Sequence, residues 1–483
     1  MPATTPHYLI GDTWGTASEL PPMPVINPAT GEALYDVPCC GPDHVARALA
    51  HAETGFAAWS ATPGWERARV LRRIAEEITR RREDLGRAIA TEMGRVHSMC
   101  LGEADSAAEN FVWMAGEAER LFGQTLPSRF GGQLNITPEP VGIVAAFSPW
   151  NFPLSLPARK LAPALAAGCV VILRPSEQTP LVGTILGECC QAAGLPAGVV
   201  QILQGHPDHI SPALIEAEAV RKVSFTGSTR VGRMLMAQSA RTVKRVSMEL
   251  GGHAPLILCP DADVPAAAKL AAKFKFMNSG QVCGSPSRFF LHEDVAEEFT
   301  DVFLTEARAI RMGDPMSPET TMGPMASPAQ LDKLERLVSE AVARGATLRL
   351  GGTRAEAPNG GFFFAPTVLE DVPGEAAIMT EEPFGPVASL TTYSDLTEAI
   401  ARANNTDYGL AAYAFTRSEA MMRRLSAELR SGMVGINNFL LSHLEAPFSG
   451  VKHSGVGIEG GQMAIKEYLA YKTTHIMPET PAA

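Results

Sequence analysis

The feature that most constrains the fold of this chain is an alternation of short β-rich runs with helical stretches in residues 141–250. The runs are VGIVAAF (141–147), CVVILR (169–174), VVQIL (199–203), KVSFT (222–226) and RVSMEL (245–250). Strands that alternate with helical stretches of about 10 to 15 residues are typical of βαβ units. The pattern therefore predicts a parallel sheet that is covered by helices on both faces.

A second series of strand-like runs indicates a second α/β block. It comprises FFLHE, TLRL, FFFAPTVL, VASLTTY, YAFT and MVGIN. Ahead of the first block, apolar residues at helical spacing predict a helix over 65–93 that ends at Gly94, and a second helix over about 103–122. A chain of 483 residues is long enough for two or three domains.

Composition and charge narrow the classes of function. The chain is 46% hydrophobic, and its net charge of −11 is spread along its length, so we expect no nucleic-acid partner. No run approaches the roughly 18 apolar residues of a membrane span, and the first basic residue is Arg47, so we expect neither a membrane segment nor a signal peptide. The eight cysteines and eleven histidines form no CxxC or HExxH pattern. We therefore expect a cytoplasmic protein with reduced thiols and no metal site.

Residues that follow the predicted strands are informative, because open parallel sheets bind ligands at the carboxyl ends of their strands. TGSTRVG places Gly227 and Gly232 at the start of a helix, whose free N–H groups can hold a pyrophosphate. Ordinary strand–helix turns have similar glycines, and the segment is not a GxGxxG motif. SPWNFPL places Trp150 and Asn151 in a rigid turn, which either packs the indole or presents an oxyanion donor.

Two further residues have alternative interpretations. Glu249 ends a predicted strand before two glycines, and is either a hydrogen-bonded structural acid or a general base whose pKa is raised in a dry site. Cys283, in NSGQVCGSP, is either a small core residue or a nucleophile. No histidine is arranged as in a cysteine protease. A nucleophilic thiol, a separate base, an amide donor and a dinucleotide turn together predict oxidation of an aldehyde through a thioester.

Nine segments, in sequence order, resemble those of the aldehyde dehydrogenases from near the start of the chain to near its end. They are INPATGE, FSPWNFPL, RPSEQTP, AGLPAGV, SFTGSTRVG, MELGG, NSGQVC, EEPFGP and APFSGVKHSG. ELGGHAP, GQVCGSPSRFF and YGLAAYAFTRS are most similar to the succinate- and 2-oxoglutarate-semialdehyde dehydrogenase branch. The resemblance implies an α/β fold with a Rossmann-like parallel-sheet cofactor domain, an α/β catalytic domain and a small β oligomerisation arm.

The same resemblance implies the roles of individual residues. Cys283 would attack the aldehyde, and the Asn151 amide and the Cys283 backbone N–H would hold the oxyanion. Glu249 would activate the water that hydrolyses the thioester, and Lys160 would assist proton relay. The residues expected to bind the cofactor are Trp150, Gly227, Ser228 and Gly232 around the pyrophosphate, Glu382 on the nicotinamide ribose, Phe384 beside the nicotinamide ring, and Arg174 and Glu177 on the adenosine ribose.

The choice between NAD and NADP depends on two of these residues, which give opposite indications. Arg174 stands where most relatives have a lysine, and its planar fork suits a 2′-phosphate. Glu177 should accept ribose hydroxyls and repel that phosphate. We give the carboxylate more weight and expect NAD as the main cofactor, with NADP as the alternative.

The expected substrate residues are Arg159, Met277, His443 and Phe152. Relatives that oxidise succinate semialdehyde bind its distal carboxylate with an arginine at the position of Met277 and a serine at the position of His443. Arg159 retains a third binding group, unless it serves only as a salt bridge at the rim. A carboxylate with a single partner loses much of its binding energy, so we expect a semialdehyde or related small aldehyde with a bulkier or less charged tail. An uncharged aliphatic or aromatic aldehyde is the alternative.

We expect a dinucleotide-binding domain in 1–122 and 142–251 and a catalytic domain in 252–452. Segments 123–141 and 453–483 would build a homodimer or homotetramer, with KEYLAYKTTHIMP as a strand. Two rival functions are CoA-acylating or acyl-phosphate chemistry, in which a thiol or phosphate resolves the thioester, and a structural or binding protein that retains the fold without turnover. Relatives of the first kind lack a base at Glu249, and the second would not need Cys283, Glu249 and Asn151 together.

Overall fold

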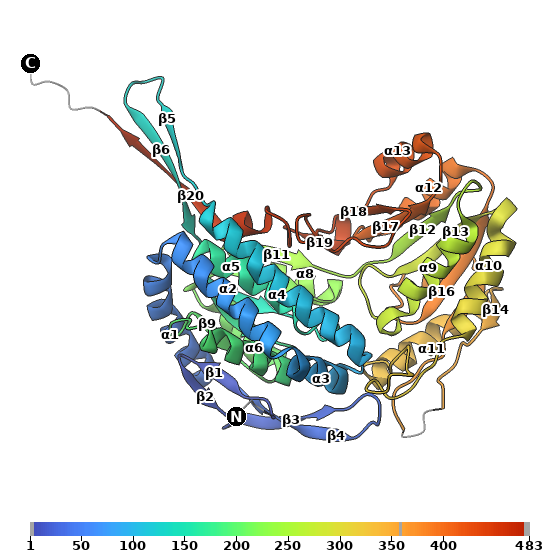
Figure 1. The fold of residues 1–483 in the computed structure, drawn as a ribbon, viewed down its shortest axis with the longest axis horizontal. Helices are drawn as coiled ribbons and strands as arrows, with labels where there is room; N and C mark the ends of the chain where they lie inside the picture. The colour runs from blue at the N-terminus through green and yellow to red at the C-terminus, as the bar shows by residue number, and fades with distance from the viewer. Residues whose placement is uncertain (1–3, 357–359, 478–483) are drawn as a thin grey trace, which may run out of the picture.

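A computed structural model describes residues 4–356 and 360–477, and shows two α/β units with a β arm that projects from the first (Figure 1). The first unit contains an eight-stranded sheet with the order β19-β11-β10-β7-β8-β9-β1-β2. Its five inner strands β11 to β9 are parallel, whereas the edge strands run antiparallel to their neighbours. The strands are β1 Tyr8–Ile10, β2 Thr13–Gly15, β7 Ile143–Phe147, β8 Val170–Arg174, β9 Val200–Ile202, β10 Val220–Thr226, β11 Arg245–Glu249 and β19 Gly455–Val456.

The five predicted runs are confirmed as the inner strands of this sheet. Strands β7 and β8 are buried at every position, as expected for strands that are covered on both faces. Phe147, the last residue of β7, pairs with Phe225 in β10 and Arg174 in β8, and Thr226 pairs with Glu249. This register brings the segments that follow β7, β8, β10 and β11 to one edge of the sheet.

Helices cover the first sheet, with α2 and α4 packed against each other on the outside (Figure 1). The helix predicted over 65–93 is wrong as a single element, because the chain turns at Arg81 and forms α2 and α3. The Arg81 side chain pairs with Asp84 and Glu188 and so anchors the turn. Gly94 ends α3 in a left-handed conformation, as predicted. The helices are α1 Pro42–Ser60, α2 Gly64–Arg80, α3 Arg82–Met93, α4 His97–Glu119, α5 Ser155–Ala167, α6 Pro180–Ala192, α7 Pro207–Glu216 and α8 Thr229–Ala240.

The second unit contains a seven-stranded sheet with the order β14-β15-β16-β13-β12-β17-β18, in which only β14 is antiparallel. Of the predicted run FFFAPTVL, only the part after Pro366 is a strand. The strands are β12 Ala254–Leu258, β13 Pro286–His292, β14 Thr347–Leu350, β15 Thr367–Glu370, β16 Val387–Tyr393, β17 Ala411–Phe415 and β18 Met433–Ile436. The helices are α9 Val264–Phe276, α10 Glu293–Arg308, α11 Pro328–Ala343, α12 Leu396–Asn404 and α13 Glu419–Glu428, with 3-10 turns η1 Met277–Gly280, η2 Ala377–Met379 and η3 Lys452–Ser454.

Two small antiparallel sheets complete the structure. The arm pairs β5 Gln124–Pro127 and β20 Leu469–Ile476 with β6 Gln133–Pro140, and a ribbon pairs β3 Leu20–Ile26 with β4 Ala33–Cys39. The segment before β20 belongs to the first unit, because β19 extends its sheet and the 3-10 turn η4 Ala464–Tyr468 joins its hydrophobic core. Of the segment expected over 453–483, residues 478–483 lie outside the described residues, and within the described part β20 alone lies in the arm.

Candidate active site

The loop that carries Cys283 has an unusual backbone. It follows α9 and η1, and Asn278, Ser279 and Gly280 have φ angles of 52°, 55° and 70°. Left-handed conformations are unfavourable for residues other than glycine and persist where surrounding structure holds them. Here the Ser279 hydroxyl donates to the Gly323 carbonyl at 2.7 Å. A Cβ at position 280 would lie 2.1 Å from the Gly385 carbonyl oxygen, so only glycine fits.

Cys283 differs from the other cysteines in its exposure. The other seven are buried, whereas Cys283 is half-buried. Burial raises the pKa of its thiol to about 12, the Glu382 and Glu249 carboxylates add to the rise, and Arg159 opposes it. The Cys283 thiol thus lies in the electrostatic field of two carboxylates and one guanidinium. A base must take the thiol proton before the sulfur can act as a nucleophile.

Asn151 is buried in the turn after β7 and reaches the loop of Cys283. Its side-chain Nδ2 donates to the carbonyl of Gln281 at 3.1 Å. Gln281 lies two residues before Cys283, so the predicted amide donor lies close to the loop that carries the predicted nucleophile.

Glu249 ends β11 and is buried, and within residues 4–356 and 360–477 neither of its carboxylate oxygens has a hydrogen-bond partner. Burial raises its pKa well above the ordinary value, the Glu459 carboxylate raises it further, and Lys160 and Arg159 oppose the rise. A structural acid would be hydrogen-bonded. The bare carboxylate with a raised pKa is instead the arrangement expected of a general base.

Lys160 lies fully buried in α5, close to the same carboxylate. Its Nζ donates to the Thr226 hydroxyl at 2.7 Å and to the Ser224 hydroxyl at 3.4 Å, and it forms an ion pair with Glu459. Sequence reasoning missed Glu459, which lies in the segment assigned to oligomerisation. A signal was present, because IEGG repeats the acid-before-glycines pattern of Glu249.

The residues expected around the nicotinamide are brought together from both units. The rings of Trp150 and Phe384 meet edge to face with centroids 5.7 Å apart. Glu382 accepts a hydrogen bond from the backbone N–H of Gly252 at 3.0 Å, and burial raises its pKa to about 7. A Cβ at Gly251 would lie 2.7 Å from a Glu382 oxygen, so glycine leaves room for this carboxylate.

The turn after β10 begins α8 as predicted. The Ser228 hydroxyl caps the helix by accepting from the Val231 N–H at 3.4 Å. Gly232 is buried, and a Cβ there would lie 2.3 Å from a Leu250 methyl group. Close packing of α8 on Leu250 thus requires glycine at 232 whether or not it also borders a pyrophosphate.

Arg174 and Glu177, which the sequence placed in conflict, form an ion pair with each other. The Arg174 guanidinium also donates to the Gly205 carbonyl at 3.1 Å. Both residues lie at the carboxyl end of β8, on the edge of the sheet that carries the rest of the site.

Of the expected substrate residues, Arg159 is buried in α5 next to Lys160, and its charge lowers the pKa of Cys283 and Glu249. It forms a hydrogen bond with the Ser442 hydroxyl and stands 5.0 Å above the Phe448 ring. Ser442 was missed, although it adjoins His443. His443 is exposed and its Nε2 lies 3.1 Å from the Leu440 carbonyl oxygen.

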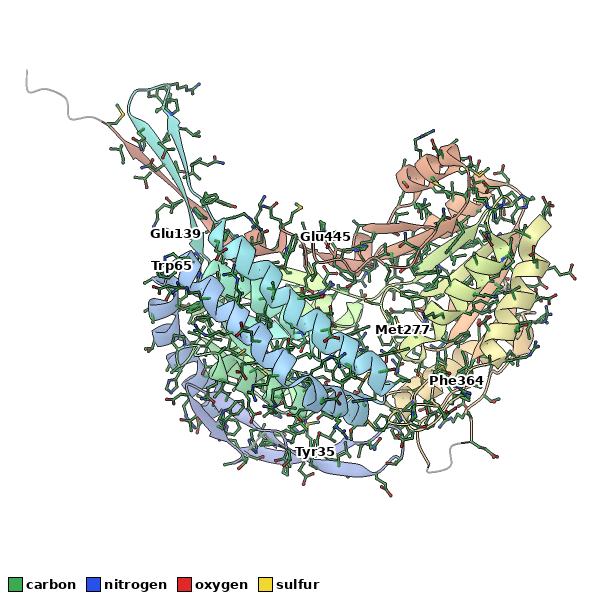
Figure 2. All side chains as sticks on the ribbon, viewed as in Figure 1. Tyr35, Trp65, Glu139, Met277, Phe364 and Glu445 are labelled. Carbon is green, nitrogen blue, oxygen red and sulfur yellow. The ribbon has the colours of Figure 1, made fainter. Side chains whose placement is uncertain are left out.

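The remaining two expected substrate residues come from different units. Met277 is half-buried at the end of α9, on the side of the second unit that faces the first (Figure 2). Phe152 follows Asn151 and packs under the Arg95 guanidinium, 4.0 Å from its ring centroid.

Two further observations concern ligands and membranes. In the described ranges no group of three or more His, Cys, Asp or Glu side chains could hold a metal ion. None of the helices in those ranges is long and apolar enough to cross a bilayer.

Two α/β units that gather a thiol, an amide and a carboxylate at the carboxyl edge of a Rossmann-like sheet define an NAD(P)-dependent oxidoreductase. The chain belongs to the aldehyde dehydrogenase family, which residues 14–474 match. It is 40% identical over 465 residues to the mitochondrial succinate-semialdehyde dehydrogenase of Oryza sativa, covering 96% of this chain and 88% of the relative. It is 41% identical over 471 residues to the 4-(hydroxymethyl)benzenesulfonate dehydrogenase of Comamonas testosteroni, covering 97% and 98%.

The solved structures agree. The succinate-semialdehyde dehydrogenase of Burkholderia pseudomallei superposes with a TM-score of 0.96 at 39% identity, covering 98% of both chains. The predicted fold, the oxidation of aldehydes to carboxylates and the dependence on NAD or NADP are confirmed.

Proposed function

We propose that Cys283, Asn151 and Glu249 oxidise the aldehyde through a thioester on the Cys283 sulfur. The observation that carries this proposal is the meeting of three segments. The strained loop of Cys283 meets the Asn151 amide, and the bare carboxylate of Glu249 raises the pKa of the Cys283 thiol. Among the described residues the buried Glu249 carboxylate has no hydrogen-bond partner, which a structural role does not explain.

The residues act in a fixed order. Glu249, with its raised pKa, accepts the Cys283 proton, and the sulfur forms a bond to the aldehyde carbon. The second N–H of the Asn151 amide, whose first N–H donates to the Gln281 carbonyl, and the Cys283 N–H receive the oxyanion. The nicotinamide, when bound, supplies the acceptor for the hydride that leaves this carbon.

The Lys160–Glu459 pair passes the Cys283 proton on to solvent, which leaves Glu249 ionised again, and hydrolysis then uses the same carboxylate. Glu249 takes a proton from water, the water oxygen adds to the acyl carbon, and the carbon–sulfur bond breaks to release the carboxylate. The Lys160–Glu459 pair beside Glu249 carries the proton away. The balance is one aldehyde, one water and one oxidised nicotinamide giving one carboxylate, one reduced nicotinamide and two protons.

The cofactor proposal assigns Glu382, Trp150 and Phe384 to the nicotinamide end and Gly227, Ser228 and Gly232 to the pyrophosphate. The half-buried Glu382 carboxylate accepts a hydrogen bond from the Gly252 N–H, and Gly251 makes room for it, which supports this assignment. Glu177 neutralises the Arg174 guanidinium, so a 2′-phosphate would meet an already paired cation beside a negative charge. This arrangement supports NAD as the main cofactor.

The proposed substrate is a semialdehyde or a related small aldehyde whose tail is bulkier or less charged than that of succinate semialdehyde. Arg159 supplies one cation, Met277 contributes apolar surface, and the His443 ring is held at a backbone carbonyl. An uncharged aliphatic or aromatic aldehyde is the second candidate, favoured by Met277 where a guanidinium would bind a carboxylate.

We also propose the division into a cofactor domain, a catalytic domain and an oligomerisation arm, with residues 453–468 assigned to the first. The arm exposes Leu126, Phe130, Tyr471 and Ile476. A small ribbon with exposed apolar side chains needs a further surface to cover it, which supports a homodimer or homotetramer. All eight cysteines are free thiols, which supports a cytoplasmic location.

Turnover by a Cys283→Ala variant tests the proposal, with Cys259→Ala as the matched control, because Cys259 is a buried cysteine of the same unit. NADH formation is followed with succinate semialdehyde, glutarate semialdehyde, hexanal and benzaldehyde. We expect the Cys283 variant to be inactive with all four and the control to match the parent. Residual turnover by Cys283→Ala would contradict the mechanism, and acceleration by added CoA would favour the CoA-acylating rival.

A further inference from the structure

A buried arginine connects the two segments that carry the proposed oxyanion donor and the nucleophile. Arg95 lies between α3 and α4 and is only 4% exposed. One nitrogen of its guanidinium donates to the backbone carbonyl of Asn151, and its Nε donates to the Asn278 side-chain oxygen at 3.2 Å. The same group covers the Phe152 ring at 4.0 Å. Arg95 therefore touches the turn of Asn151 on two sides and the loop of Cys283 on one.

The two segments are also hydrogen-bonded to each other around this arginine. The Asn278 Nδ2 donates to the Asn151 carbonyl at 3.3 Å and to the Gln281 carbonyl at 3.2 Å. The Asn151 Nδ2 donates to the same Gln281 carbonyl at 3.1 Å. Arg95 thus belongs to a hydrogen-bond network that also contains Asn151, the proposed oxyanion donor, and Asn278, whose backbone is left-handed.

The positive charge of the buried Arg95 guanidinium is compensated by the carboxylate of Glu103 in α4. It forms an ion pair with Arg95, and its other oxygen accepts from the backbone N–H groups of Leu154 and Ser155 at 2.9 and 3.0 Å. Those N–H groups begin α5, which carries Arg159 and Lys160 further along. One buried pair therefore fixes the start of α5, the Asn151 turn and the Asn278 side chain together.

We infer that Arg95 is a positioning residue. It holds the Asn151 amide against the loop of Cys283, so that the oxyanion donor and the nucleophile are correctly placed relative to each other when the aldehyde binds. The inference rests on the function proposed above. A planar guanidinium presents donors in three directions while its face lies on Phe152, and the point charge of a lysine cannot reproduce that geometry. Arg95→Lys should therefore lower turnover even where it keeps the ion pair with Glu103.

The test compares Arg95→Lys with a double variant, Arg95→Met/Glu103→Met, which removes the pair without leaving a buried charge. Arg81→Lys is the control, because Arg81 is a partly buried arginine of the same unit whose partners, Asp84 and Glu188, lie apart from this network. For each variant we would measure kcat, the KM for NAD, the first-turnover burst of NADH and the isotope effect with aldehyde deuterated at the reacting carbon.

A displacement of reacting groups by about 1 Å lowers turnover by about 10²-fold. We expect both Arg95 variants to lose about that factor in kcat, to keep a KM for NAD within about twofold of the parent, to lose the burst and to gain an isotope effect. Arg81→Lys should match the parent throughout. A purely structural role would instead lower the melting temperature and raise the KM for NAD, without an isotope effect.

Such a result, or a kcat of Arg95→Lys within about threefold of the parent, would overturn the inference. The proposed function is tested separately and first, by measuring NADH formation by the parent and by Cys283→Ala before the Arg95 variants are compared. If the parent forms no NADH with an aldehyde, or if Cys283→Ala does, the inference falls with the proposed function.

Discussion

Replacing Glu249 by glutamine should have opposite effects on activity and stability. General-base assistance contributes about 10²- to 10⁴-fold to a rate, which corresponds to about 3 to 5 kcal/mol of barrier. We expect kcat of Glu249→Gln to fall by that factor, because glutamine cannot take a proton from water. At alkaline pH hydroxide can take the Cys283 proton in place of Glu249, so a burst of about one NADH per Cys283 should persist under that condition.

The stability effect follows from the raised pKa of Glu249, which burial and then the Glu459 carboxylate produce. A carboxyl group whose pKa is higher in the folded protein than in the unfolded chain destabilises the fold as pH rises above its unfolded pKa. Each unit of that difference amounts to about 1.4 kcal/mol. The carboxylate has no hydrogen bond to lose among the described residues. Glu249→Gln should therefore gain stability relative to the parent as pH rises, until the folded carboxyl group ionises.

Denaturant unfolding at about pH 5 and about pH 8, at one protein concentration, measures this difference. Any effect of the new amide that is independent of pH cancels between the two conditions. The predicted result is a stability advantage for Glu249→Gln that is larger at the higher pH, together with a retained NADH burst and slow turnover. A variant with kcat within about tenfold of the parent, or with an advantage that does not change with pH, would refute the assignment of Glu249 as a base of raised pKa.

Two further substitutions test the cofactor and substrate residues. Glu177→Gln removes the charge that repels a 2′-phosphate and releases Arg174 from its ion pair, so the ratio of kcat/KM for NADP to that for NAD should rise by about tenfold or more, or about 1.4 kcal/mol. An unchanged ratio would contradict the assignment. Met277→Arg adds a guanidinium, and a charged hydrogen bond contributes about 1.5 to 3 kcal/mol, so kcat/KM for succinate semialdehyde relative to hexanal should rise about 10- to 100-fold. Met277→Leu should leave that ratio unchanged, and equal effects of Met277→Arg on both aldehydes would exclude Met277 from the substrate site.

The central part of the fold could be predicted because its strands are buried on both faces and read as short continuous apolar runs. The same reasoning failed where no local signal exists. The break at Arg81 interrupts an apolar pattern that continues unchanged on both sides, and its cause is the contact with Glu188 from a distant helix. The edge strands β1 and β2 are three residues each, which is too short for a periodicity to be recognised.

The residues of the candidate site likewise include some that the sequence could predict and some that it could not. Cys283, Asn151 and Glu249 each lie in a short motif, so the sequence could show them, although it could not show that they meet. Glu459 and Arg95 act through partners that are distant in the chain. Glu459 reaches Lys160 from 299 positions away, and Arg95 reaches Asn278 from 183 positions away. Only the folded structure reveals these contacts, the first within the first unit and the second between the two units.

The central claim is that the acyl group is carried by the Cys283 sulfur. The most direct measurement is acid quenching of Glu249→Gln during its first turnover with NAD and an aldehyde at alkaline pH, followed by peptide mass spectrometry. The account predicts that the peptide containing Cys283 gains the mass of the acyl group in place of the thiol hydrogen, in the same amount as the NADH formed. NADH formed without that adduct, or an adduct on any of the other seven cysteines, would contradict it.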